Sequence, residues 1–79
     1  MTVTDHHKNV AHIVIDCCVG DIMQGKHYTE CKYIMGIAGK IFKGDISSLT
    51  PTDVHAYNNY LFGNESRIEF YLQYDYTKD

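Results

Sequence analysis

The chain has 79 residues, and this length limits how large a core it can bury. Folded chains of this size cover only about 60% of the surface that they expose when unfolded. Doubly wound nucleotide-binding folds, barrel enzymes and two-domain arrangements all need larger cores. We therefore expect residues 1–79 to form a single small domain with a thin core.

The composition and the N-terminal sequence indicate the compartment. Ten acidic and seven basic residues give a net charge of −3, and 44% of residues are hydrophobic, as in an ordinary folded chain. There is no secretory signal and no apolar run near the roughly 20 residues of a membrane helix. Three cysteines, two of them adjacent, are a poor disulfide framework. We expect a cytoplasmic protein without a membrane partner.

The strongest local signals begin a helix over residues 51–62. Thr50 is a good N-cap, Pro51 suits the first helical turn, and Asp53 is placed to complete a reciprocal cap. The apolar residues that follow share one face at helical spacing: Val54, Tyr57 and Leu61.

Residues 4–24 fit a second helix, capped by Thr4 and carrying apolar residues at spacings of three and four. Many of these residues are β-branched, which leaves a strand open as the alternative for residues 10–18. The helix is preferred because the apolar spacing extends over the whole segment.

Residues 29–43 predict a third helix. Its apolar stripe consists of Ile34, Ile37, Ala38 and Ile41. Gly36 and Gly39 each cost an isolated helix roughly 1 kcal/mol relative to alanine. We expect these small residues to let a neighbouring helix approach closely; the alternative is that they mark a bend or a short pair of strands.

The pattern changes at residues 67–76, where apolar and polar side chains alternate as on a strand. Such a strand needs a partner for its backbone, either residues 10–18, a second copy of the chain in a homodimer, or another protein. The expected fold is therefore small α+β and mainly helical, with about three helices and a C-terminal strand. An all-α bundle is the alternative.

Four side chains are weak candidates for a zinc site: Cys17, Cys18, His27 and Cys31. Adjacent cysteines rarely both point at one ion, so we expect buried apolar cysteines and no metal. No nucleophile–base pair, phosphate loop or pair of carboxylates suggests catalysis. We expect neither an enzyme nor a cofactor.

Seven tyrosines form the most unusual feature of the composition. Tyrosine is enriched at protein interfaces because it joins a large apolar ring to a polar tip. Two acidic residues near the C-terminus add charge complementarity to a basic partner. The predicted partner-binding surface consists of Tyr57, Tyr60, Glu69, Tyr71, Tyr74, Asp75 and Tyr76.

The sequence thus predicts a small binding protein that acts by occupying a surface of another protein or protein complex. In size and composition the chain resembles small accessory proteins of bacteriophages and mobile elements, although the resemblance covers no motif. Many such proteins block host enzymes or defence complexes, anti-CRISPR proteins among them. The resemblance implies an inhibitor that acts in the cytoplasm of a host cell.

The alternative function is a small nucleic-acid-associated transcription regulator that uses a basic segment: Lys26, Lys32, Lys40 and Lys43. The short connection to residues 51–62 fits a helix-turn-helix protein. However, residues 51–62 contain no Lys or Arg for contacts to phosphates or guanines, and the net charge is negative. We therefore do not expect nucleic acid to be the main partner.

Overall fold

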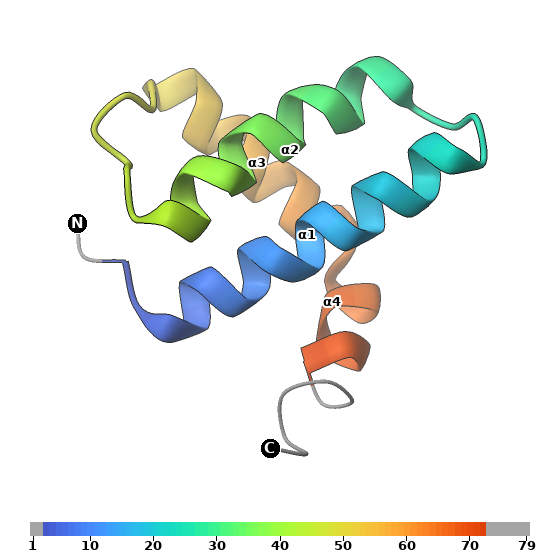
Figure 1. Ribbon diagram of the computed structural model, residues 1–79, viewed down its shortest axis with the longest axis horizontal. Coiled ribbons are helices and arrows are strands. Elements are labelled where there is room, and N and C mark those ends of the chain that lie inside the picture. Colours follow the sequence, from blue (N-terminus) through green and yellow to red (C-terminus); the bar gives the residue numbers. More distant parts are fainter. Residues whose placement is uncertain (1–2, 73–79) are drawn as a thin grey trace.

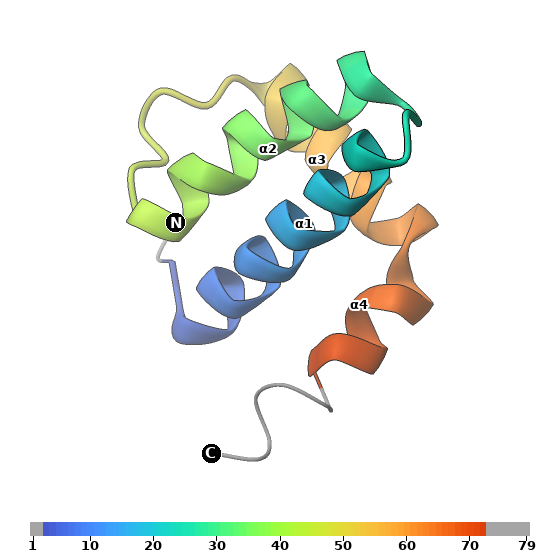
Figure 2. The ribbon, with the colours of Figure 1, turned by 45° about the vertical axis from the view of Figure 1, so that its right-hand side comes forward.

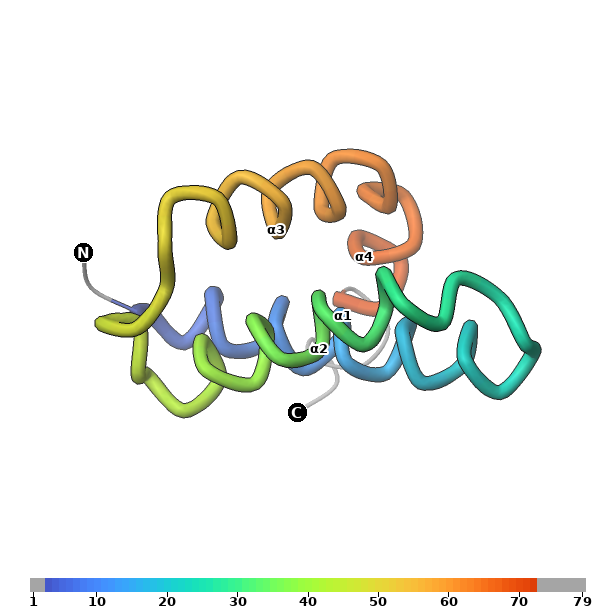
Figure 3. The backbone as a smooth tube through the Cα atoms, turned by 90° about the horizontal axis from the view of Figure 1, so that it is seen from above, coloured from blue at the N-terminus to red at the C-terminus, as the bar shows by residue number. Residues whose placement is uncertain are grey.

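The computed structural model describes residues 3–72, which form four helices (Figure 1). The helices are α1 (Asp5–Met23), α2 (Tyr28–Lys43), α3 (Pro51–Gly63) and α4 (Glu65–Tyr71). α1 and α2 pack side by side in opposite directions and form one layer, and α3 crosses over that layer (Figure 3). The short α4 leaves the end of α3 and packs beside α1 (Figure 2).

Two helices begin with the same reciprocal cap. The Thr4 hydroxyl accepts from the backbone N–H of His7 at 3.2 Å, and the Thr4 N–H donates to His7 Nδ1 at 3.1 Å. Thr50 and Asp53 repeat this exchange at the start of α3, with both distances 3.1 Å. These bonds satisfy backbone donors that a helix start leaves unpaired, so both predicted caps are confirmed.

The bounds of the three predicted helices are confirmed to within one residue at each end. Glycine supplies the left-handed backbone that follows α1 and α2, with φ of +76° at Gly25 and +80° at Gly44. The strand alternative for residues 10–18 is wrong, because α1 runs through the whole segment.

The core lies between the α1–α2 layer and the helices that cover it. The predicted stripe of α2 faces inward, with Ile34, Ile37 and Ala38 buried and Ile41 half-buried. α1 adds five buried residues, and α3 adds Tyr57 and Tyr60. The two glycines of α2 do not mediate a close helix contact, because a Cβ at Gly36 or Gly39 would meet no atom within 4 Å.

The predicted C-terminal strand is wrong. Residues 65–71 form α4, there is no strand among residues 3–72, and residues 73–76 lie outside the described part of the chain. Ile68 is buried and Leu72 is half-buried, four residues apart on one helical face, whereas Phe70 is 59% exposed. Helical packing of Ile68 and Leu72 thus overrides the alternating pattern, and the all-α alternative fits.

The predicted strand was also the proposed contact of a homodimer. Because residues 65–71 are helical, they cannot pair as strands between two copies of the chain. The α3–α4 junction is a single residue, Asn64, whose side-chain amide donates to the Tyr60 carbonyl at 2.9 Å. Arg67 then joins α4 to the end of α1 through an ion pair with Asp21 at 3.4 Å. These contacts place α4 against α1 and leave no extended edge over residues 64–72.

Candidate functional site

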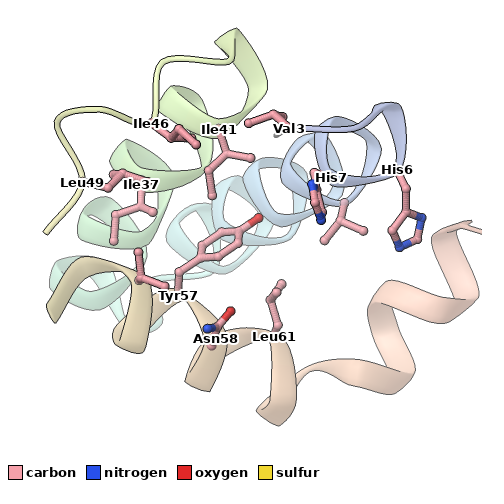
Figure 4. Close-up of a pocket in the computed structure, with 12 residues that line it drawn as sticks. Val3, His6, His7, Ile37, Ile41, Ile46, Leu49, Tyr57, Asn58 and Leu61 are labelled. Atoms are coloured by element: carbon pink, nitrogen blue, oxygen red, sulfur yellow. The ribbon is translucent and has the colours of Figure 1, made fainter. Parts of the chain in front are cut away.

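A hollow with a mainly apolar lining and a volume of about 370 Å³ lies at the surface of the described chain (Figure 4). Three helices and the α2–α3 loop form its walls. Their apolar contributions include Val10 from α1, Ile37 and Ile41 from α2, Leu49 from the loop, and Val54 and Leu61 from α3. Three exposed polar residues, His6, His7 and Asn58, also line it. This arrangement is typical of a binding pocket, in which a few polar groups surround an apolar interior.

A smaller hollow of about 180 Å³ lies between α1, α3 and α4. It shares His6, Val10 and Leu61 with the larger hollow, so the two hollows are adjacent. Ile68 and Leu72 form its α4 wall. We call the joined surface the apolar groove, defined by the residues that line either hollow.

Tyr57 lies between α2 and α1 within the larger hollow, with Ile37 and Ile41 on one side and His7 on the other (Figure 4). Its side chain is buried, and its hydroxyl has no hydrogen-bond partner among residues 3–72. Burial raises the pKa of Tyr57 to about 12. The hydroxyl therefore stays neutral at physiological pH, and leaving it unpaired costs about 1–3 kcal/mol.

Tyr60 is also buried, but its hydroxyl is paired. It accepts a hydrogen bond from the Cys18 thiol, with a sulfur–oxygen distance of 3.5 Å. Burial raises the pKa of Tyr60 and raises that of Cys18 to about 12. The two rings that were predicted to anchor a partner on α3 are thus core residues. The shared face of Val54, Tyr57 and Leu61 was the sequence signal that already pointed Tyr57 inward.

The remainder of the predicted tyrosine surface is only partly described. Glu69 and Tyr71 are exposed on α4, where the Tyr71 ring meets the Phe70 ring edge-on at 5.5 Å between centroids. Glu69 also lines the smaller hollow. Tyr74, Asp75 and Tyr76 lie outside the described residues.

The sequence did not single out Phe62, which is 82% exposed at the end of α3 and lines the smaller hollow. An exposed phenylalanine beside an apolar hollow enlarges the surface available to a partner. Its exposure could have been predicted from the sequence, because Phe62 does not belong to the apolar helical face formed by Val54, Tyr57 and Leu61.

The predicted basic segment lies on a different face. Its four lysines, Lys26, Lys32, Lys40 and Lys43, are all exposed. Lys32 and Lys40 line an open groove of about 550 Å³, together with Tyr28, Tyr33 and Gly36. We call this surface, which includes Ile37 and Asp53, the α2 groove.

Asp53 closes the α2 groove on the α3 side. The Tyr33 hydroxyl donates to its carboxylate, which also accepts from the Thr50 N–H. These two hydrogen bonds, with a smaller contribution from the charge of Lys40, lower the pKa of Asp53. The carboxylate is therefore already occupied by groups of the chain itself.

The weak metal candidates come together only in part, because Cys18 and Cys31 interact in the core whereas His27 lies at the surface. Cys17, Cys18 and Cys31 are buried free thiols, and His27 is exposed at the start of α2. Burial raises the pKa of both Cys17 and Cys18, which keeps these thiols protonated at neutral pH. Within residues 3–72, no three His, Cys, Asp or Glu side chains are grouped to hold a metal ion.

No helix within residues 3–72 combines the length and apolarity needed to cross a membrane.

Comparisons with known protein families, curated proteins and solved structures found no match to this chain. The two grooves are therefore interpreted from their own residues.

Proposed function

We propose that this chain is a non-enzymatic binding protein that holds an amphipathic helix of a partner protein in the apolar groove. The adjacency of the two hollows carries this proposal. Because they share Val10 and Leu61, they offer adjacent places for successive apolar side chains. A helix that docks through one face presents its apolar residues at that kind of spacing.

The composition of the groove supports an apolar face on the partner. Most of its lining residues are isoleucine, leucine and valine, and several of them, such as Val10, Ile41 and Leu61, are packed against the core. A site whose side chains are already packed needs little reordering when a partner binds, which favours affinity. Phe62, which is largely exposed beside the smaller hollow, would be covered by the same helix.

The charges around the groove support a basic flank on the partner. Glu65 and Glu69 are exposed and line the smaller hollow. Lys or Arg residues beside the apolar face of the partner helix would be attracted to this edge. The resemblance to phage accessory proteins would make the partner a host enzyme or a defence complex, blocked by occupation of its surface. That identity and the cytoplasmic location stay predictions.

Two labelled peptides test the proposal by fluorescence anisotropy. Each is an amphipathic helix of about five turns with leucines on one face, and the other positions are lysines in one peptide and glutamates in the other. We expect the lysine peptide to bind at least about tenfold more tightly than the glutamate peptide.

Adjacent asparagines provide the matched variants. Asn58 and Asn59 are both exposed on α3, but only Asn58 lines the groove. Asn58→Trp should cover the larger hollow and weaken binding of the lysine peptide at least about tenfold, whereas Asn59→Trp should change it less than about twofold. Equal effects of the two tryptophans, or no binding by either peptide, would contradict the proposal.

A further inference from the structure

The α2 groove combines cationic and aromatic side chains on one helix. Tyr28 and Tyr33 are 58% and 45% exposed. Lys32 lies between these two tyrosines along the helix, and Lys40 lies after Tyr33. Lys32 Nζ lies 5.9 Å from the centroid of the Tyr28 ring. Among residues 3–72, the lining of the apolar groove contains no lysine or arginine, so the two surfaces differ in chemistry.

From this combination we infer that the α2 groove binds single-stranded nucleic acid. Lysines follow the phosphates of a strand, while exposed aromatic rings stack on its bases. Lys32 and Lys40 are separated by about 12 Å along the helix axis. Lys26 and Lys43 are also exposed, just before the start of α2 and at its last residue, but they do not line the groove.

The local charge favours an anionic strand despite the negative net charge. α2 carries Lys32, Lys40 and Lys43 against a single acid, Glu30, which does not line the groove. Asp53 does line it, but its carboxylate accepts hydrogen bonds from the Tyr33 hydroxyl and the Thr50 N–H. The groove therefore presents two lysines and one carboxylate, and that carboxylate accepts hydrogen bonds from the chain itself.

The aromatic rings distinguish a single strand from a duplex and from an acidic peptide. Bases in a duplex are stacked on each other and cannot stack on Tyr28, whereas the bases of a single strand can. An oligoglutamate peptide would use the lysines but has no aromatic ring to stack on Tyr28. A duplex-reading helix in α3 is disfavoured because α3 contains no Lys or Arg.

Gly36 leaves the floor of the groove without a side chain. It is exposed, its φ is not in the left-handed region, and a Cβ there would meet no atom within 4 Å. Neither backbone geometry nor packing therefore requires glycine at this position. The bare backbone allows a flat base to approach between Tyr33 and Lys40.

The probe is labelled oligothymidylate of about 12 nucleotides, measured by fluorescence anisotropy at several salt concentrations. Each neutralised phosphate of a single strand contributes about −0.7 to the slope of log K against log salt. Lys32→Gln and Lys40→Gln should each reduce that slope by about 0.7. Lys8→Gln, on α1 and outside the groove, should leave it unchanged.

Two further variants separate stacking and shape from charge. Tyr28→Leu should weaken oligothymidylate binding at least about fivefold. Gly36→Leu should fill the groove and weaken binding to a similar extent, while Gly39→Leu, which also has open space for a Cβ but does not line the groove, should not.

Three results would overturn the inference. The first is no binding of oligothymidylate at low salt. The second is equal binding by the matching duplex. The third is an oligoglutamate peptide that binds as tightly as oligothymidylate and whose binding does not change with Tyr28→Leu. That result would assign the groove to an acidic protein.

Discussion

The apolar groove and the α2 groove are built in different ways. The apolar groove uses the outer edge of the core, so residues such as Leu61 both line the site and pack against buried neighbours. The α2 groove uses exposed side chains, such as Lys32 and Tyr28, that stand on the outer face of a helix. Changes in the first should therefore affect stability and binding together, whereas changes to the exposed side chains of the second, such as Lys32, should affect binding with little effect on stability.

Ile37 is where this difference can be tested most strongly, because it lines both grooves and is only 4% exposed. Ile37→Ala should lower the free energy of unfolding by about 2–5 kcal/mol, through lost burial and a residual cavity. Lys32→Gln should change it by less than about 0.5 kcal/mol. Denaturant titration measures both values. A loss below about 1 kcal/mol for Ile37→Ala would mean that the floor shared by the grooves is not part of the core.

The two buried tyrosines should respond with opposite signs. Tyr57→Phe removes a buried hydroxyl that has no partner within residues 3–72 and should raise the free energy of unfolding by about 1–3 kcal/mol. Tyr60→Phe removes the acceptor of the Cys18 thiol and should lower it by up to about 1 kcal/mol. Thermal unfolding of both variants provides the comparison. Destabilisation by Tyr57→Phe would show that the hydroxyl is paired in solution.

Gly36 should give a smaller effect on stability. Gly36→Ala should raise the free energy of unfolding by about 0.5–1 kcal/mol, because alanine favours the helix and its Cβ meets no other atom. The gain is measurable by chemical denaturation. A loss of stability would mean that the open side of α2 is occupied in solution.

Asp53 links the α2 groove to the start of α3 and should give a pH effect. Hydrogen bonds from Tyr33 and Thr50 lower its pKa below the ordinary value of 3.8. This contribution to stability is present above pH 3.8 and is lost as the pH falls through the lowered pKa. Asp53→Asn should therefore melt at a lower temperature than the unchanged chain at neutral pH, and the difference should shrink in acid. A constant difference from pH 7 to pH 2 would exclude the carboxylate as its source.

The sequence predicted the helices well where capping signals are local. Thr4, Thr50 and Gly44 each mark a helix end through contacts within a few residues, and the three predicted helices match the structure. The C-terminal segment failed because its outcome depends on long-range packing. Alternation fits a strand, but burial of Ile68 beside α1 and α3 selects a helix.

Neither groove as a whole could be predicted. The basic residues of α2 were identified because they are close in sequence, but the joining of Tyr33 to Asp53 is a tertiary contact. The apolar groove brings Val10 and Leu61 together from distant segments, and no local pattern encodes this. The high tyrosine content led to the wrong prediction that Tyr57 and Tyr60 lie at a partner-binding surface. Both are buried, because a tyrosine ring can pack in a small core as well as at an interface.

Methyl NMR of the unchanged chain, titrated with the lysine-flanked amphipathic peptide, asks directly whether the apolar groove is the docking site. We predict that the largest shifts will occur at Val10, Leu61 and Leu72, which line the groove. The methyl groups of Ile34, buried at 1% exposure, should shift least. Saturable binding without shifts at Val10 and Leu61 would contradict the proposed function.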